Sequence, residues 1–322
     1  MSFHRHLRLP VLALALAVQA AAHAAYPDRA VTMVVPFPPG AGTDITARAL
    51  GAELQKRLGQ TIVIVNKAGA GGMIAGDFVK NAQPDGYTLL FGAIAPLAIA
   101  PNLYKKPAYD PLKDFTSIGS VAYVTSVLMV NTKAPYKSVK ELFDKARSAP
   151  APMTYGSFGN GSTAHVGAVE LTRQAGVQMT HIPYKGSAPA SLALQAGEID
   201  MMFENMPSAV RNVQAGRVRA IAVSSAERSK LMPEVPTLRE AGFDFEMRAW
   251  YGVVAPAGLP ADIAKRLNAE INAALNAPDF KQSLEAQGAE PFPGTMEGFK
   301  DYVAQENQRW RKVILQAGAQ VD

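Results

Sequence analysis

Short runs of hydrophobic and β-branched residues alternate with longer amphipathic stretches from about residue 30 onward. The short runs predict strands at residues 31–35, 61–65, 88–92, 153–156, 179–183, 200–203 and 219–224. In the longer stretches, apolar residues three and four positions apart predict helices at residues 44–58, 139–148, 164–175, 188–196 and 263–275. Gly59, Gly176 and Gly197 follow three of these helices, at a position where glycine often ends a helix. The alternation is typical of an α/β fold with largely parallel sheets.

Two segments interrupt this alternation. Residues 117–131 and 246–255 are rich in β-forming residues and longer than an average strand, and no helical pattern interrupts them. We interpret them as two strands that cross between lobes, each lobe a mostly parallel sheet flanked by helices. On this interpretation residues 25–124 and 251–322 form lobe 1, and residues 125–250 form lobe 2. The alternative is two sequential domains joined near residues 149–152, but a Pro-rich segment between a helix and a strand is also typical of an ordinary loop.

The N-terminus has the three parts of a secretory signal peptide. Residues 4–8 are basic, residues 9–18 form an apolar run, and Ala22-His23-Ala24 has the small-x-small pattern of a cleavage site. The apolar run is shorter than the roughly 20 residues that a membrane span needs. A lipoprotein would need a cysteine at the cleavage site, and the chain has no cysteine. We therefore expect residues 1–24 to be removed on export to the periplasm.

Charge and composition narrow the classes of partner. Removal of residues 1–24 takes away two arginines and no acids, so the formal charge falls from +5 to +3 (5 − 2). The basic residues are scattered among acids rather than clustered, which argues against a nucleic-acid partner. Without cysteines, the fold depends on its hydrophobic core. The 298 remaining residues (322 − 24), in a chain that is 48% apolar, suffice for about two domains.

The strongest chemical signal is a pair of glycine-rich loops, each between a predicted strand and a predicted helix. Residues 36–44 read PFPPGAGTD, and residues 155–165 read YGSFGNGSTAH. Glycines permit a close backbone approach, and Ser or Thr (Asp44 as well in the first loop) can cap the helix that follows. Free N–H groups at a helix start attract a carboxylate or phosphate. One such loop could equally be a capped turn without a ligand, but two of them, one in each lobe, predict an anion-binding cleft.

Two further loops follow predicted strands. Residues 184–187 (YKGS) include a cation, although Lys185 could also be a solvated loop lysine, and residues 203–207 (FENMP) lie where open α/β sheets bind ligands. We expect Phe37, Phe158, Tyr184 and Phe203 either to form walls of the cleft or to belong to the core. The candidate ligand-binding residues from these loops are Phe37, Pro39, Gly40, Ala41, Thr43, Asp44, Ser157, Gly159, Asn160, Gly161, Ser162, Thr163, His165, Tyr184, Lys185, Gly186, Glu204 and Asn205.

Enzymatic motifs are weak by comparison. Residues 68–73 (AGAGGM) lack the third glycine of a dinucleotide loop, and no GK[ST] follows. The chain has neither a cysteine nor a GxSxG elbow. After residue 24 the only histidines are His165 and His181, without the spacing of a zinc site. We therefore expect no catalytic residues, metal or cofactor, and we interpret His165 as hydrogen-bonded to the glycine-rich loop.

Segments along the whole chain after residue 24 resemble the Bug-type extracytoplasmic solute receptors of tripartite tricarboxylate transporters. The segments that carry the resemblance are residues 26–29 (YPDR), 34–44 (VVPFPPGAGTD), 65–72 (VNKAGAGG), 84–90 (PDGYTLL), 159–165 (GNGSTAH), 182–186 (IPYKG), 197–200 (GEID), 216–223 (GRVRAIAV) and 235–237 (VPT).

This resemblance implies a periplasmic-binding-protein (Venus flytrap) fold without catalytic activity. It implies that a small organic carboxylate binds largely through backbone amides and waters, and that residues 37–44, 157–165 and 184–186 supply the contacts. The partners would be that ligand and the integral-membrane subunits of a transporter, and we expect a monomer.

The chain departs from the family pattern after the strand at residues 88–92. The family commonly has a polar loop there, whereas residues 93–101 read AIAPLAIAP, so Ala93 and Ile94 become an apolar wall of the predicted site. This wall favours a ligand with an aromatic or aliphatic body. The competing hypotheses are a secreted hydrolase-like enzyme and a sensory adaptor that keeps the same fold.

Overall fold

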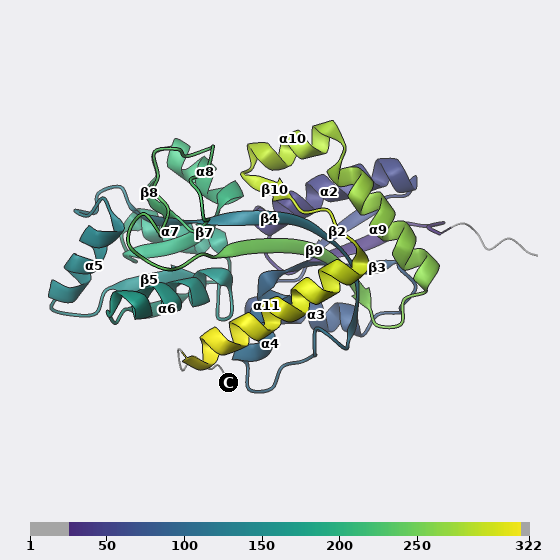
Figure 1. Ribbon diagram of the computed structural model, residues 1–322, viewed down its shortest axis with the longest axis horizontal. Helices are drawn as coiled ribbons and strands as arrows, with labels where there is room; N and C mark the ends of the chain where they lie inside the picture. Colours follow the sequence, from purple (N-terminus) through teal and green to yellow (C-terminus); the bar gives the residue numbers. More distant parts are fainter. Residues whose placement is uncertain (1–25, 317–322) are drawn as a thin grey trace, which may run out of the picture.

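Two lobes lie side by side along the long axis of the molecule, joined by two long strands (Figure 1). This computed structural model describes residues 26–316, so the predicted signal peptide lies outside the described residues. The joining strands are β4 (Phe115–Asn131) and β9 (Arg248–Pro256), which pair antiparallel with each other. They correspond to the crossing segments predicted at residues 117–131 and 246–255.

The first lobe contains the N-terminal strands and the C-terminal helices. β2 (Ile62–Asn66), β1 (Val31–Val35) and β3 (Thr88–Ala93) pair in parallel, β3 pairs antiparallel with β9, and β10 (Ala289–Pro291) pairs antiparallel with β4. The helical elements of this lobe are α2 (Gly42–Leu58), the short turns η1 (Ala70–Gly72) and η2 (Ala95–Ile99), α3 (Met73–Lys80), α4 (Ala100–Leu103), α9 (Ala261–Leu275), α10 (Pro278–Ala286) and α11 (Met296–Gln316).

The second lobe repeats the pattern on the other half of β4. β6 (Thr180–Pro183), β5 (Thr154–Ser157) and β7 (Met201–Asn205) pair in parallel, whereas β7 and β8 (Val218–Val223) pair antiparallel with β4. Its helices are α5 (Val139–Ser148), α6 (Thr163–Ala175), α7 (Ser187–Ala196) and α8 (Met206–Gln214).

The predicted two-lobe α/β fold is confirmed, with one refinement. Three strands in each lobe are parallel as expected, but β4 and β9 run antiparallel to their neighbours, so each sheet is mixed. Gly59, Gly176 and Gly197 end their helices in the left-handed conformation, as the sequence predicted.

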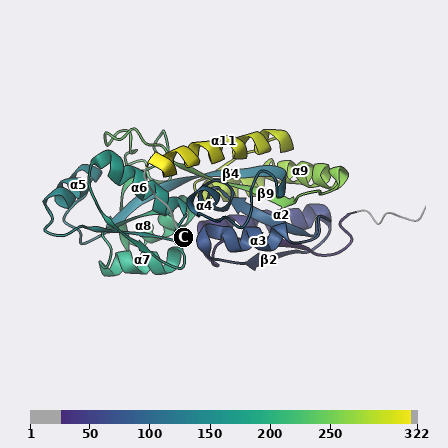
Figure 2. The ribbon, with the colours of Figure 1, turned by 90° about the horizontal axis from the view of Figure 1, so that it is seen from below.

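A buried carboxylate fixes α11 against the crossing strands. Glu306 of α11 accepts hydrogen bonds from the indole nitrogens of Trp250, on β9, and Trp310, at 3.1 and 3.2 Å, and Arg309 pairs with its other oxygen. A buried charge needs such partners, because an unpaired one is costly to desolvate. Figure 2 shows α11 along one side of the crossing strands, with α3 and α7 on the opposite side of the molecule. Helix α11 is thus fixed against the crossing strands that connect the lobes.

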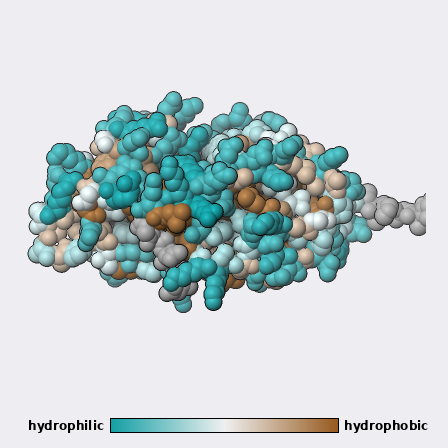
Figure 3. All heavy atoms as spheres, turned by 60° about the horizontal axis from the view of Figure 1, so that its bottom comes forward, coloured by the Kyte–Doolittle hydropathy of each residue, from teal (hydrophilic) through white to brown (hydrophobic). Residues whose placement is uncertain are grey.

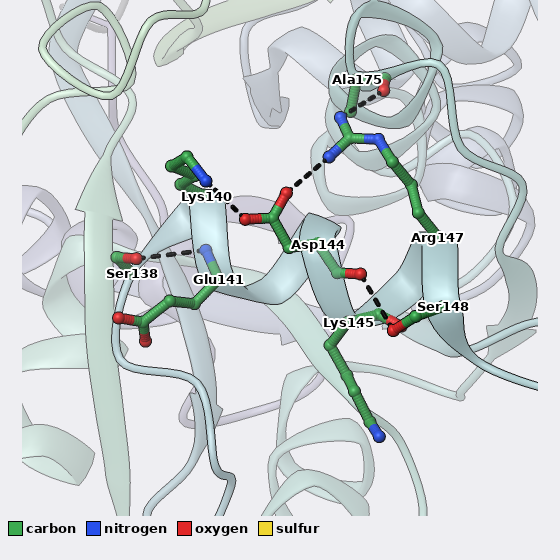
Figure 4. Close-up of polar contacts among 8 residues, drawn as sticks. All are labelled: Ser138, Lys140, Glu141, Asp144, Lys145, Arg147, Ser148 and Ala175. Carbon is green, nitrogen blue, oxygen red and sulfur yellow. Dashed lines mark hydrogen bonds and ion pairs between the residues drawn. The ribbon is translucent and has the colours of Figure 1, made fainter.

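Helix α5 illustrates local capping far from that connection (Figure 4). The Ser138 hydroxyl accepts the N–H of Glu141 at 3.2 Å, which satisfies a free donor of the first turn. Asp144 pairs with Lys140 and Arg147 at 2.6 and 2.9 Å, and the Arg147 guanidinium also reaches the Ala175 carbonyl at the end of α6. Because these ion pairs are exposed to solvent, they contribute little to stability.

Hydrophobic residues are dispersed on the face of the molecule that Figure 3 shows. The face in Figure 3 is mostly hydrophilic, and its hydrophobic patches are small. Between residues 26 and 316, no helix is both long enough and apolar enough to cross a membrane.

Three stacked rings join β5, β6 and the first turn of α6. The ring of His181 lies between those of Tyr155 and His165, with centroid distances of 4.9 and 4.1 Å. Ser157 Oγ and His181 Nε2 are 2.6 Å apart, and the Gly161 N–H donates to His165 Nδ1 at 3.3 Å. Burial lowers the pKa of His165 to about 4, and burial together with His165 lowers the pKa of His181 to about 3.

The two histidines make the second lobe acid-sensitive. Their folded pKa values lie below the unfolded value near 6.5, so the unfolded chain binds more protons, and stability falls as the pH drops below about 6.5 towards 4. We expect the unfolding free energy to fall by about 1–3 kcal/mol between about pH 7 and pH 5, as measured by urea denaturation. His165→Gln should lessen this fall by about 1–2 kcal/mol, because it removes one of the two histidines, whereas Glu204, whose pKa burial raises to about 7, acts in the opposite direction in both proteins. An unchanged pH slope in that variant would contradict the assignment.

Candidate functional site

A small cavity that is open to solvent lies between the two lobes. Residues of both lobes and of the crossing strand β9 line this cavity. The lining residues are Phe37, Ala41, Gly42, Thr43, Ala93, Ile94, Ala95, Phe158, Thr163, Ser187, Glu204, Asn205, Ala249 and Tyr251.

Four helices begin at this cavity. α2 contributes Gly42 and Thr43 from the first lobe, while α6 and α7 contribute Thr163 and Ser187 from the second. Asn205, the residue before α8, also lines it. The first N–H groups of a helix have no acceptor within the helix, and the helix dipole makes that end partly positive. None of the lining residues is Lys, Arg or His. Helix starts and neutral polar side chains, rather than cationic side chains, are therefore what the lining offers to an anion.

Asp44 holds the first glycine-rich loop in place through hydrogen bonds on the side away from the cavity. Its carboxylate accepts the Gly40 N–H at 2.9 Å, Arg48 Nε at 3.0 Å and Asn66 Nδ2 at 2.9 Å. Burial opposes ionisation, but these hydrogen bonds lower the pKa of Asp44 below its usual value. All of its partners lie outside the set of cavity-lining residues. Asp44 therefore fixes the shape of the loop from outside the cavity, while Gly42 and Thr43 at the start of α2 line it.

Tyr251 of β9 joins the two lobes at the base of the cavity. Asn205 donates to its hydroxyl at 3.2 Å, and the same hydroxyl is hydrogen-bonded to Thr43. Ser126 of β4 in turn bonds Asn205 at 3.4 Å. Both crossing strands thus contact residues that line the site.

Glu204 at the end of β7 is the one carboxylate that lines the cavity, and it is 1% exposed. The Asn205 N–H donates to Oε1 at 2.8 Å, and the Ser187 hydroxyl donates to Oε2. Burial raises the pKa of Glu204 to about 7, although these two hydrogen bonds and the charge of Arg211 act in the opposite direction. Glu204 can therefore change protonation state near neutral pH.

The lobes are in contact on either side of the cavity. The rings of Phe37 and Phe158 meet edge to face with centroids 6.4 Å apart, and Arg211 of α8 donates to the Gly40 carbonyl at 3.1 Å. A Cβ added at Gly161 would lie 3.2 Å from the Ala100 Cβ. This is a closed arrangement, in which Gly40 and Gly161 both lie at the boundary between the lobes.

Eight of the candidates from sequence line the cavity, namely Phe37, Ala41, Thr43, Ala93, Ile94, Thr163, Glu204 and Asn205. The candidates that lie outside its lining are Pro39, Gly40, Asp44, Ser157, Gly159, Asn160, Gly161, Ser162, His165, Tyr184, Lys185 and Gly186. Several of these build the loops instead: Ser162 caps α6, and His165 binds the loop N–H of Gly161, as the sequence predicted. Neither Thr43 nor Asp44 occupies the cap position expected for them, because the cap residue of α2 is Ala41 and no side chain bonds there.

Six lining residues were absent from the candidates: Gly42, Ala95, Phe158, Ser187, Ala249 and Tyr251. Gly42, Phe158 and Ser187 lie within loops that the sequence had already singled out. Ala249 and Tyr251 are two positions apart on β9 and so share one face of the strand. That alternation was the available signal, since the opposite face carries Trp250 against α11.

The geometry does not favour the hydrolase hypothesis. Ser157 and His181 are hydrogen-bonded, but Ser157 is fully buried and neither residue lines the cavity. A histidine with a pKa of about 3 is a weak base. Within residues 26–316, no group of three or more His, Cys, Asp or Glu side chains is placed to hold a metal ion.

Comparison with known proteins identifies close relatives over nearly the whole chain. Residues 46–319 match the family model described as the tripartite tricarboxylate transporter family receptor. Protein BugT of Bordetella pertussis is 37% identical over 298 residues, which cover 92% of this chain and 91% of BugT. A Pseudomonas protein encoded in the tcbD-tcbE intergenic region is 38% identical, with 91% and 87% covered.

Solved structures agree with these relatives. Rpa4515 of R. palustris, determined with adipate, has a TM-score of 0.89 and 36% identity, covering 92% of this chain and all of its own. MatC of Rhodopseudomonas palustris, determined with malate, has a TM-score of 0.86 and 35% identity, covering 90% of this chain and all of its own. The periplasmic binding protein BugD has a TM-score of 0.88 and 34% identity, covering 92% of this chain and 99% of its own. The chain therefore belongs to the family of tripartite tricarboxylate transporter receptors, with the two-lobe fold of periplasmic binding proteins.

Proposed function

We propose that this protein is a non-enzymatic receptor that captures a small organic carboxylate and delivers it to the membrane subunits of a tripartite tricarboxylate-type transporter. The observation that carries the proposal is the cavity at which four helices begin and which no lysine, arginine or histidine lines. Such a cavity can hold a carboxylate through backbone N–H groups and helix dipoles. Rpa4515 and MatC, determined with adipate and malate, are consistent with a carboxylate ligand.

Ligand capture would couple to movement of the lobes. We propose a hinge in β4 and β9, with residues 25–124 and 251–322 moving as one lobe and residues 125–250 as the other. A ligand that contacts α2 from the first lobe and α6 from the second stabilises the closed arrangement, because it binds both halves at once. Closure therefore reports occupancy to the transporter.

The remaining parts of the proposal concern location and assembly. The signal-peptide pattern of residues 1–24 supports export to the periplasm, with cleavage after Ala24. We propose a monomer, because a cleft that opens and closes is simplest without a second subunit across its mouth.

Ligand binding should stabilise the protein against heat. At a hundredfold excess over Kd, a carboxylate that binds only the folded state should add about 2.7 kcal/mol to the unfolding free energy. We would screen mono- and dicarboxylates by thermal shift, with protein that has been unfolded and refolded to remove carried-over ligand. Absence of a shift with every carboxylate would count against the receptor function.

The aromatic contact between the lobes should contribute to affinity. Phe158→Leu keeps an apolar wall but loses the edge-to-face pair with Phe37, which is worth about 0.5–1.5 kcal/mol, so Kd should rise about two- to tenfold. Isothermal titration calorimetry measures this change. Phe78→Leu, at an exposed position of α3 outside the cavity, is the matched control and should leave Kd unchanged. Equal affinities for all three proteins would contradict the role of this contact.

A further inference from the structure

Glu204 is an unexpected group in a cavity suited to anions. Of the lining residues, it alone carries a carboxyl group, and no cation lines the cavity to neutralise it. Its side chain is almost completely buried, so its environment is fixed by the protein and the ligand rather than by bulk water. Any ligand in the cavity shares this small volume with the Glu204 carboxyl.

The Glu204 carboxyl already occupies part of the anion-binding surface of the second lobe. One oxygen accepts the N–H of Asn205 at the start of α8, and the other accepts the hydroxyl of Ser187 at the start of α7. These are the interactions that a ligand carboxylate would otherwise make at those two helix ends. At these two helix starts, the Glu204 carboxyl therefore takes the place of a ligand carboxylate.

The helix starts left for a ligand carboxylate are those of α2 and α6. Gly42 and Thr43 line the cavity at α2, and Thr163 lines it at α6. A ligand whose carboxylate binds there turns its far end towards Glu204. Each oxygen of Glu204 makes one hydrogen bond and can accept another, so it suits a donor at that end of the ligand.

We propose that Glu204 makes the cavity select carboxylates whose far end carries a hydroxyl or ammonium donor, over carboxylates that are ionised at both ends. This inference rests on the proposed receptor function and specifies its substrate class. A second ionised carboxylate would face Glu204 across a cavity without a cation, and the two groups could share the site only if a proton joined them. A dicarboxylate would therefore bind with the uptake of a proton.

The groups around Glu204 support this behaviour. Arg211 of α8 acts on it through its charge, but its guanidinium is exposed and bonded to Gly40. The phenol of Tyr251 on β9 has a raised pKa, chiefly through burial and also through Glu204, so it stays neutral. Val127, opposite Glu204 on β4, is apolar. A pKa of about 7 for Glu204 places its proton exchange within an accessible range.

The remaining neighbouring elements add no buried cation. His165, which α6 carries, is held neutral by burial, with a pKa of about 4. Lys185, just before α7, is exposed and lies outside the cavity lining. The titration of Glu204 therefore controls the charge of the site near neutral pH.

The test compares adipate with 6-hydroxyhexanoate and 6-aminohexanoate by isothermal titration calorimetry at about pH 6.5 and about pH 8.5, where free carboxylates are ionised. Wild-type protein should bind the hydroxy or the amino acid at least about tenfold more tightly than adipate at the higher pH. The adipate affinity should fall by up to about tenfold per pH unit above about pH 7. At about pH 8.5, where Glu204 of the free protein is ionised, titrations in two buffers of different ionisation heat should show uptake of close to one proton with adipate and none with 6-hydroxyhexanoate.

Glu204→Gln removes the titrating group and keeps the size of the side chain. It should abolish the proton uptake and raise adipate affinity at least about tenfold relative to 6-hydroxyhexanoate. Glu170→Gln is the matched control, because Glu170 is a buried acid of the same lobe that pairs with Arg173 outside the cavity. It should leave the preference and the proton uptake as in the wild type.

The outcomes separate this inference from the proposed function. Tight adipate binding at the higher pH, without proton uptake and unchanged by Glu204→Gln, would overturn the inference and leave the receptor function in place. Failure of wild-type protein to bind any carboxylate would overturn both. If Glu204→Gln does not fold, the proton uptake and the pH dependence of the wild type decide the matter.

Discussion

The structure depends on bringing several helix starts together at one point without a cation among them. A single helix end attracts an anion by only about 0.3–1 kcal/mol when exposed, so a useful site needs several ends in a space that excludes water. In a single parallel sheet, the helices that follow the strands all start along one edge of the sheet. Two lobes can place two such edges opposite each other. The double crossing of the chain through β4 and β9 makes that possible, because it joins the lobes while leaving a cavity between them.

Close approach of the lobes requires small residues at the boundary. An added Cβ at Gly186 would lie 2.7 Å from Pro38, and one at Gly71 would lie 2.8 Å from the Asn160 carbonyl. Both glycines have positive φ, so larger side chains would be strained there as well as crowded. The glycine-rich loops thus serve closure as much as anion binding. That explains why many of their residues lie beside the cavity rather than in its lining.

The sequence predicts most strands well, because they lie in apolar runs bounded by turns; β1 agrees to the residue, the other predicted strands agree within a few residues, and the three-residue strand β10 was not predicted. Helices α3, α4, α8, α10 and α11 were not predicted either. Of these, α3 and α8 are short and each contains a weak helix former, Gly76 in α3 and Pro207 in α8. The glycine-rich loops were found from sequence, but the lining was found only in part. Alternation along β9 places Ala249 and Tyr251 on one face of the strand, but that this face borders the cavity follows only from the way β9 crosses between the lobes.

The same geometry explains how one fold can distinguish related acids. Backbone N–H groups bind any carboxylate, so α2 and α6 provide general affinity but little discrimination. Discrimination must come from side chains that meet the rest of the ligand: here the apolar wall of Ala93, Ile94 and Ala95, and the carboxyl of Glu204. A buried acid costs desolvation energy unless its partners donate a proton or a hydrogen bond to it. Both oxygens of Glu204 accept hydrogen bonds from the protein, so the cost of burying this side chain is partly offset without a ligand. A ligand can supply a further hydrogen-bond donor to Glu204. A ligand without a donor leaves the free acceptor positions of the Glu204 carboxyl without a hydrogen bond.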